Sequence, residues 1–337
     1  MDTWSICGNT LSPGEKRQTV LRVPMGGQPH DGRLPGRMAA EDDYEIPATL
    51  ICGAAPGKTL LISASIHSGE YVGIPAVIRT ARALDPRRMK GCVVLLHCVN
   101  LSGVLTHSYR FVPEDGFNLN SGYPGRADGT VGERLAAWFV RELFPNVDFI
   151  LDLHGGSPEE AMTPLFFFPC AKKVRAASLA AAKATNVPYT LESRAMNGEY
   201  SYAATTFGIP GLLLERGSGL FCTEAEVRAE QDDIRLLLDH LGIYPAEPGT
   251  FNAGLQRRTF RDTVYLESDI HGLWYPAVEK DADVKKGQLL GRTEDYFGNI
   301  LQEYYAAADG HVVYYTRGLA VRPGDALVTY VLLASEE

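Results

Sequence analysis

The chain has 337 residues, of which 45% are hydrophobic, enough to bury a substantial core in one large domain or two. Its formal charge is −9 and its Lys and Arg residues are scattered, so we expect neither a nucleic-acid partner nor an anionic membrane partner. Six cysteines without a CxxC pair, an N-terminus without a signal-peptide pattern, and no apolar run of about 18 residues favour a cytoplasmic protein.

Strand and helix patterns alternate along the first two thirds of the chain. Strands are expected at Arg17 to Val23, Tyr44 to Cys52, Thr59 to Ile66, Cys92 to Val99, Asp148 to Leu153 and Gly211 to Glu215, and helices at Tyr71 to Leu84, Val131 to Leu143, Lys172 to Thr185 and Thr223 to Leu241. A Gly- and Pro-rich loop from Met25 to Arg37 separates the first two strands. The strand, helix, strand order is typical of a parallel sheet, so we predict an α/β fold.

The pattern changes after Pro245 to Gly254, which reads as a linker. Short alternating runs separated by Gly, Asp and Pro turns follow, at Thr263 to Leu266, Leu289 to Arg292, His311 to Tyr315 and Ala326 to Tyr330. This pattern predicts a smaller all-β barrel or sandwich domain at residues 255–337. Residues 1–245 would then form the catalytic domain, with a leading β segment at residues 1–52.

Candidate metal ligands follow two of the predicted strands. His67 and Glu70 are three residues apart after the strand that ends at Ile66, and His154 follows the strand that ends at Leu153. Two histidines and a carboxylate can hold one zinc ion and leave a position open for water. The pair His67 and Glu70 could instead form a polar cluster that caps the helix starting near Tyr71.

Three further polar residues are candidates for catalysis. Glu215 ends a buried strand and could serve as a general base beside a metal-bound water, or could form a salt bridge with Arg216. Arg110, in a turn-rich loop, could stabilise an oxyanion, and Asn120 of the same loop could bind the substrate. That loop could also be an ordered surface loop held by Asx turns. Asp152 could orient an imidazole or cap the next turn.

These motifs, in this order, resemble the succinylglutamate desuccinylase/aspartoacylase family, a branch of the zinc carboxypeptidase fold. The resemblance spans about residues 17 to 331 and rests on His67 to Ile74, Asp115 to Asn120 with Pro124 and Gly125, Asp148 to His154, and Glu215. It implies a mixed sheet flanked by helices with a C-terminal β domain that narrows the entrance. It further implies an amidohydrolase that removes an acyl group from a small amine, similar to the bacterial branch of N-acetyl-diaminobutyrate deacetylases.

The resemblance also implies roles for single residues. His67, Glu70 and His154 would bind one zinc ion per chain, Glu215 would be the general base, Arg110 would face the oxyanion and Asn120 would contact the substrate.

One residue departs from the family pattern. The chain reads Asn118-Leu119-Asn120-Ser121 where the family has an arginine in the last position, and that arginine usually holds a substrate carboxylate. A serine hydroxyl cannot replace a bidentate guanidinium. We therefore expect either that Arg216, Arg126 or Arg194 supplies the charge beside Ser121, or that the substrate has no carboxylate there.

Two other functions stay open at this point. A carboxypeptidase-like peptidase acting on short or modified peptides would use the same zinc chemistry. A catalytically inactive homologue that binds a small molecule would keep the fold, although it would not need a general base beside the metal. The sequence leaves open the acyl group, the amine, the physiological metal and whether the chain forms a homo-oligomer.

Overall fold

The structure is a computed structural model that describes residues 3–35 and 42–336. The last two residues of the predicted loop from Met25 to Arg37 therefore lie outside the described residues. Among the described residues, no helix combines the length and the apolar character needed to cross a membrane.

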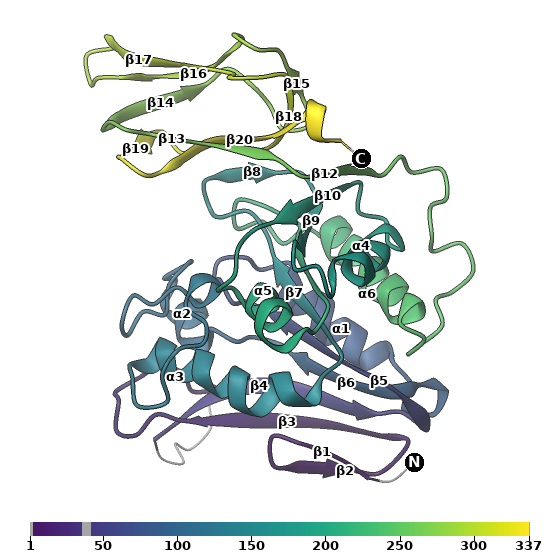
Figure 1. Cartoon of the computed structure of the whole chain (residues 1–337). Helices are drawn as coiled ribbons and strands as arrows, with labels where there is room; N and C mark the ends of the chain where they lie inside the picture. The colour runs from purple at the N-terminus through teal and green to yellow at the C-terminus, as the bar shows by residue number, and fades with distance from the viewer. Residues whose placement is uncertain (1–2, 36–41, 337) are drawn as a thin grey trace.

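A nine-stranded mixed sheet forms the centre of the molecule (Figure 1). Its strands, in spatial order, are β12 (Arg258–Phe260), β10 (Tyr189–Ser193), β9 (Leu165–Pro169), β11 (Gly211–Glu215), β7 (Phe149–His154), β5 (Ala55–Ala64), β6 (Lys90–Leu96), β4 (Asp43–Cys52) and β3 (Glu15–Pro24). The central neighbours β11, β7, β5 and β6 run parallel. β4 pairs antiparallel with both β6 and β3, and β9 pairs antiparallel with β11 but parallel with β10. A separate hairpin of β1 (Trp4–Ile6) and β2 (Asn9–Leu11) precedes the sheet.

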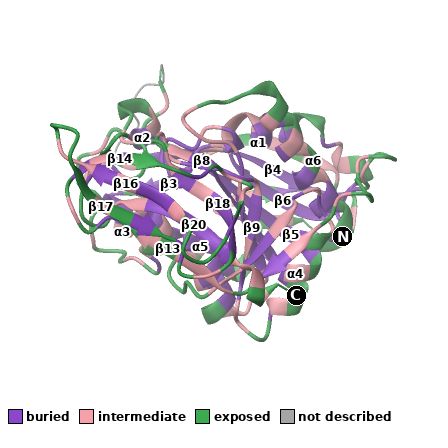
Figure 2. Ribbon diagram, turned by 90° about the horizontal axis from the view of Figure 1, so that it is seen from above, coloured by how far each residue is buried: buried purple, intermediate pink, exposed green. Residues whose placement is uncertain are grey.

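Helices cover both faces of this sheet because its strands are apolar on both sides. On β5, Leu61 belongs to one core, and its neighbours Leu60 and Ile62 belong to the other. The first core is covered by α3 (Val131–Trp138) and α5 (Glu199–Tyr202), and the second by α1 (Gly73–Ala83), α4 (Arg175–Lys183) and α6 (Glu224–His240). A short helix, α2 (Leu101–Thr106), follows β6. Figure 2 shows the buried strands between these helices. The predicted fold class is confirmed.

Two smaller sheets stack above this body (Figure 1). One contains β13 (Thr263–Glu267), β20 (Ala326–Leu332), β18 (Gly310–Thr316) and β15 (Asp283–Val284), and the other contains β17 (Ile300–Tyr305), β16 (Leu289–Glu294), β14 (Gly272–Pro276) and β19 (Ala320–Val321). They enclose a core of their own that includes Trp274, Leu327 and Tyr330.

Two strands join the large body to the C-terminal sheets. β8 (Glu160–Met162), which follows β7 in the chain, pairs with β18, and β12 pairs with β10 of the large sheet. The domain boundary between residues 245 and 255 stays a prediction, and these two pairings cross it.

The carboxyl ends of β5, β7 and β11 lie at the same edge of the large sheet. Ala64 pairs with Leu153, and His154 pairs with Glu215 in the parallel register. The loop that follows β5, which carries His67 and Glu70, therefore starts beside His154 and Glu215. Open α/β sheets place their active sites at this edge.

Candidate active site

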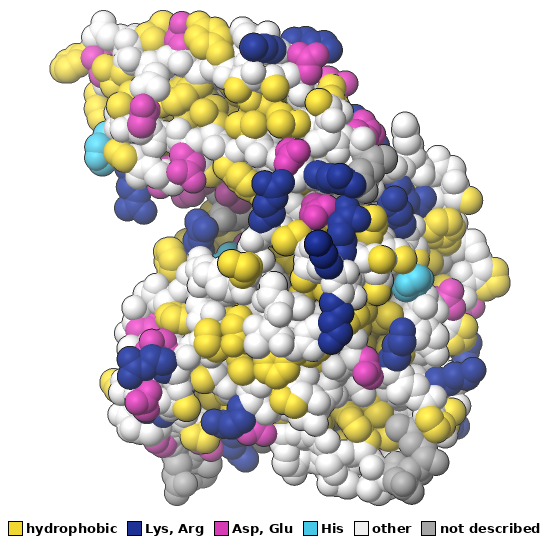
Figure 3. Space-filling view, in the orientation of Figure 1, with side chains coloured by type: hydrophobic (Ala, Val, Ile, Leu, Met, Phe, Trp, Pro, Cys, Tyr) yellow, Lys and Arg dark blue, Asp and Glu magenta, His cyan; other side chains and the backbone are white. Residues whose placement is uncertain are grey.

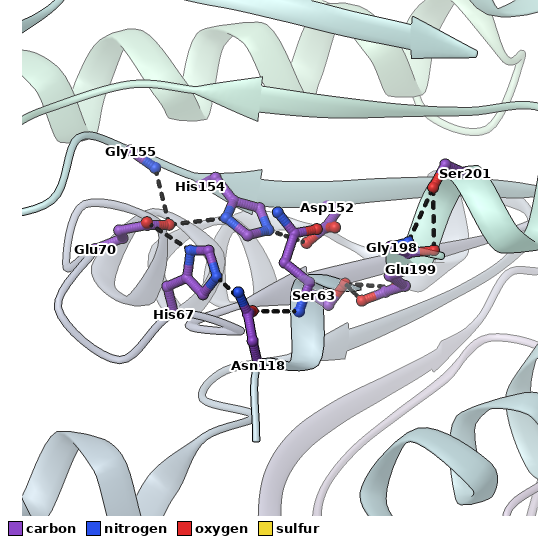
Figure 4. A network of polar contacts seen from close by, with 11 residues as sticks. Ser63, His67, Glu70, Asn118, Asp152, His154, Gly155, Gly198, Glu199 and Ser201 are labelled. Carbon is purple, nitrogen blue, oxygen red and sulfur yellow. Dashed lines mark hydrogen bonds and ion pairs between the residues drawn. The ribbon is translucent and has the colours of Figure 1, made fainter. Parts of the chain in front are cut away.

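His67, Glu70 and His154 bring three ligand atoms together at the edge of the sheet. The Nδ1 atom of His67 lies 2.8 Å from Glu70 Oε1, and the Nδ1 atom of His154 lies 2.8 Å from Glu70 Oε2. Potential ligand atoms of the three buried residues all lie within 4.8 Å of one another. Figure 4 shows both imidazoles directed at the Glu70 carboxylate.

The tautomer of His67 follows from its contact with Asn118. Asn118 Oδ1 accepts a hydrogen bond from the backbone N–H of Asn120 at 2.9 Å, so the oxygen of this amide is the atom that also faces His67 Nε2 at 3.0 Å. Nε2 must then carry the proton and donate it to Asn118. The lone pair of His67 is left on Nδ1 and points at Glu70.

Asp152 acts in the same way on His154. Its Oδ1 atom lies 3.0 Å from His154 Nε2, an ion-pair contact that does not meet the geometry of a hydrogen bond, and both side chains are buried. A carboxylate at this distance favours a proton on Nε2 and a lone pair on Nδ1. The prediction that Asp152 orients an imidazole therefore agrees with this contact, and the same strand, β7, carries both residues.

The resulting donor set fits a zinc ion. Two imidazole lone pairs and a carboxylate face one point, which is the usual protein contribution to a zinc site that keeps one position open. Burial raises the pKa of the Glu70 carboxyl, but the positive charges that His67 and His154 carry when protonated outweigh it and lower that pKa to about 2. The N–H of Gly155 also donates to Glu70 Oε2 at 3.1 Å. Glu70 is thus held ionised, as a metal ligand must be.

Glu215 lies beside this cluster at the end of β11. One of its carboxylate oxygens, Oε2, is buried and has no hydrogen-bond partner among the described residues. Burial and the negative charge of Glu70 raise the pKa of the Glu215 carboxyl well above its ordinary value. A carboxyl with a raised pKa can both accept and return a proton, which is the property that a general base and acid requires.

The cluster opens into a cavity of about 240 Å³ between the large body and the C-terminal sheets. Figure 3 shows the molecule hollowed between these two parts. The lining residues from the body include His67, Glu70, Arg110, Asn120 and Glu215, and those nearer the C-terminal sheets include Glu160, Met162, Tyr265 and Tyr314. A cavity of this size holds a small molecule.

Five predicted site residues line the cavity: His67, Glu70, Arg110, Asn120 and Glu215. His154, at the end of β7, completes the metal cluster with His67 and Glu70. Arg110 projects from the loop after α2 and makes no hydrogen bond or ion pair with another side chain among the described residues; its guanidinium lies 5.9 Å from the ring centroid of Phe111. Its charge is available to a ligand.

The structure does not bring Arg216 to the cavity, which corrects the prediction that it binds substrate. The guanidinium is buried and forms ion pairs with Asp233 at 2.6 Å and with Glu226 at 3.3 Å, both on α6. These contacts also replace the alternative of a salt bridge between Glu215 and Arg216. The reason is that Arg216 follows directly after Glu215, the last residue of β11, and successive side chains along an extended chain point to opposite faces.

Ser121 is also outside the cavity lining. It is exposed, and its backbone carbonyl accepts a hydrogen bond from Asn197 at 2.7 Å. The two other arginines considered as substitutes, Arg126 and Arg194, are exposed and pair with Asp128 and Asp262. Of the arginines named from the sequence, Arg110 alone lines the cavity.

Sequence reasoning missed several polar residues around the site. Asn118 belongs to a motif that we recognised, but its contact with His67 needed the folded loop. Behind Asp152, Ser63 Oγ lies 2.7 and 2.8 Å from the two carboxylate oxygens of buried Glu199 (Figure 4). Burial and the charge of Asp152 raise the pKa of Glu199 well above its ordinary value. No local pattern marks Glu199, because its partners lie on β5 and β7.

Comparison with known proteins agrees with this geometry. Residues 56–241 match the model of the succinylglutamate desuccinylase/aspartoacylase catalytic domain. A curated relative, the N-α-acetyl-L-2,4-diaminobutyric acid deacetylase of Halomonas elongata, is 28% identical over 293 residues, or 84% of each chain.

Solved structures with the same fold include the product-bound ectoine utilization protein EutE (DoeB) of Ruegeria pomeroyi. It is 27% identical, with a TM-score of 0.81 over 94% of this chain and 95% of that one. A succinylglutamate desuccinylase/aspartoacylase of Rhodobacter sphaeroides is 25% identical, with a TM-score of 0.80 over 94% of each chain.

The fold and the site are those of a hydrolase that acts on amide bonds, since the relatives are named as deacetylase, desuccinylase and aspartoacylase. The chain belongs to the succinylglutamate desuccinylase/aspartoacylase family.

Proposed function

We propose that this protein is a zinc-dependent amidohydrolase that removes the acyl group from a small N-acyl amino acid or N-acyl amine. The observation that carries the proposal is the convergence of His67, Glu70 and His154 in one cluster, beside the cavity that Glu215 lines. The deacetylase activity named for the Halomonas elongata relative supports it. The small cavity favours a small substrate over a long peptide.

Each residue has a distinct task in this reaction. A bound zinc ion would supply Lewis acidity beside the scissile carbonyl. Glu215 would take a proton from the attacking water and later deliver it to the departing amine. Its carboxyl group would therefore return to its starting protonation state at the end of each cycle. Arg110 would donate to the oxygen on which negative charge develops. The Asn120 side chain would hydrogen-bond the substrate.

The cellular setting is part of the same proposal. The six cysteines are free thiols, and three of them, Cys52, Cys92 and Cys98, are buried. Free thiols support action in a reducing cytoplasm. Oligomeric state stays a prediction.

Two measurements test the function. Metal content is determined by elemental mass spectrometry on protein purified without added metal, and release of free amine is measured for a panel of N-acetyl and N-succinyl amino acids. We expect about one zinc per chain in the wild type and none in His67→Ala. Wild-type protein that holds zinc but releases no amine from any member of the panel would contradict the proposal.

A further inference from the structure

Two residues of the loop that carries Arg110 have a backbone conformation that L-amino acids rarely adopt. His107 has a φ of 57° and Tyr109 has a φ of 62°. His107 follows the last turn of α2 and its N–H donates to the carbonyl of Gly103, so the end of the helix explains its conformation. Tyr109 belongs to no helix end. A residue held in this region needs surroundings that enforce it, and such residues concentrate at functional sites.

Tyr109 is the middle residue of a three-residue turn. The N–H of Arg110 donates to the carbonyl of Ser108 at 2.8 Å, and the positive φ of Tyr109 gives this turn its rarer, strained form. The turn reverses the chain directly before Arg110, whose side chain lines the cavity. The direction in which the Arg110 side chain leaves the backbone therefore depends on the turn at Tyr109.

The same turn is fastened to the loop that carries the metal ligands. The carbonyl of Tyr109 accepts a hydrogen bond from the N–H of Gly69 at 2.7 Å, and Gly69 directly precedes Glu70. One residue earlier in each loop, the Oγ atoms of Ser68 and Ser108 lie 3.4 Å apart. Two loops that are 40 positions apart in the chain thus meet at consecutive residues.

Gly69 lets the two loops approach this closely. A Cβ atom at this position would lie 3.1 Å from both Cβ and Cδ1 of Tyr109, closer than side chains usually pack, so a larger residue would push the turn away. Tyr109 is 37% exposed and does not line the cavity. It therefore acts on the site through its backbone and its packing on Gly69, and its hydroxyl has no part in this contact.

Arg110 depends on this support because its own side chain is not anchored. Among the described residues its guanidinium forms no ion pair, and the ring centroid of Phe111 lies 5.9 Å away. A charged donor stabilises developing negative charge best when it is already in place. The turn fixes the backbone of Arg110 relative to Glu70 and so limits the positions that the guanidinium can reach.

We infer that Tyr109 is a positioning residue whose left-handed turn and hydrogen bond to Gly69 hold Arg110 in place against the metal ligands, so that arginine and metal together bind a small tetrahedral anion. This inference rests on the proposed function, because Tyr109 acts through the arginine that faces the oxyanion in that reaction. The effect of changing Tyr109 should therefore vanish when Arg110 is absent.

The test measures binding of methylphosphonate, a small tetrahedral anion, by titration calorimetry on the zinc-loaded full chain. Arg110→Ala should weaken binding by at least about tenfold, because it removes a charge-assisted hydrogen bond. Tyr109→Gly should weaken binding to a similar extent, since glycine relaxes the turn, and should add little to the loss in the Arg110→Ala background. Tyr109→Phe keeps the ring that packs on Gly69 and should retain the affinity that Tyr109→Gly loses. His107→Gly is the matched control: it relaxes the other left-handed residue of the loop and should leave binding unchanged.

Four results would overturn the inference: no binding of methylphosphonate by the wild type, wild-type affinity in Tyr109→Gly, a full further loss in the Arg110→Ala background, or an equal loss in His107→Gly. The further loss would show a structural role that does not pass through Arg110.

Zinc content and hydrolysis of N-acetyl amino acids are measured on the same preparations. We expect Tyr109→Gly to retain its zinc and to lower kcat more than it changes KM, since Arg110 is placed for the transition state. Loss of zinc from Tyr109→Gly would also overturn the inference, because the turn would then support the metal loop rather than Arg110. The expected binding pattern without hydrolysis by the wild type would refute the proposed function and uphold the role of Tyr109.

Discussion

Glu215 lies directly beside His154 in the parallel pairing of β11 with β7. The two residues are 61 positions apart in the chain, yet the register of one strand pair makes them neighbours. The proposed base thus has a fixed position relative to the metal ligands, since both backbones belong to the same sheet. A site built on strands holds its geometry more tightly than one built on loops.

Replacing Glu215 should separate catalysis from metal binding. We expect Glu215→Gln to retain about one zinc per chain and to lose about 10²- to 10⁴-fold in kcat, the usual contribution of a general base. His67→Ala should lose both the bound zinc and the activity. Metal analysis and amine-release kinetics on the same preparations decide the point, and near-normal turnover in Glu215→Gln would remove this residue from the mechanism.

Arg110→Ala should lower kcat by about 10²- to 10³-fold, because the guanidinium would donate to the oxyanion in the transition state. Arg126→Ala is the matched control, since Arg126 is exposed and outside the cavity lining. The measurement is steady-state kinetics on an N-acyl substrate with zinc in excess. An Arg110→Ala enzyme with raised KM and unchanged kcat would place this residue in substrate binding instead.

Asn118→Ala should weaken zinc binding by about tenfold to a hundredfold, because His67 loses the acceptor that fixes its ring. Asn118→Asp keeps an oxygen at this position and should restore part of the affinity. Competition with a chelator measures the affinity, and Asn146→Ala, on the surface, is the control. Equal zinc affinity in Asn118→Ala and the wild type would show that His67 needs no such partner.

Arg216→Ala should destabilise the fold by about 3 to 5 kcal/mol, because it leaves Asp233 buried without its ion pair. In protein that stays folded, we expect KM for N-acyl amino acids to change little, since the guanidinium lies outside the cavity lining. Urea unfolding and kinetics are measured together. A large rise in KM with normal stability would restore Arg216 to the substrate site.

Glu230 should make stability fall as pH rises. Burial raises its pKa from 4.5 to about 8, and neither carboxyl oxygen has a hydrogen-bond partner among the described residues. The folded state therefore holds this proton more tightly than the unfolded state. The stabilisation is complete below pH 4.5 and is lost as pH rises to about 8.

The measurement is urea unfolding at several pH values, comparing wild type with Glu230→Gln. The variant should gain stability relative to wild type across that range, by at most a few kcal/mol at about 1.4 kcal/mol per pKa unit. Asp232→Asn, on the exposed side of the same helix, should show no such trend. Parallel pH curves for wild type and Glu230→Gln would refute the assignment.

The sequence predicted the elements that have strong periodicity and missed those that depend on distant partners. The strands that became β5, β6 and β11 were readable because each contains a continuous apolar run. β8 was missed, since three residues carry no period and are a strand only through β18. β9 and β10 were not identified either. Helix α3 continues into a π-helical turn at Phe139–Leu143, so the predicted end at Leu143 was close.

In the candidate site too, residues with a local sequence signal were predicted and residues that depend on distant partners were missed. Residue type and spacing singled out His67, Glu70, His154 and Glu215, because these side chains are unusual at the ends of apolar strands. Arg216 has the same local context as Glu215, and only the structure shows that its side chain faces α6. Glu160 has no sequence signal either, because it lines the cavity from β8, a strand that exists only through its pairing with β18.

The pairing of β8 with β18 also bears on how the protein is made. Residues 160–162 leave the ribosome well before their partners at 310–316, so the wall that carries Glu160 cannot form until synthesis is nearly finished. We expect ribosome-arrested chains that end before β18 to expose the segment around residue 160 to proteases, and completed chains to protect it. The metal ligands would thus be in place on the nascent chain before the wall of the cavity is complete.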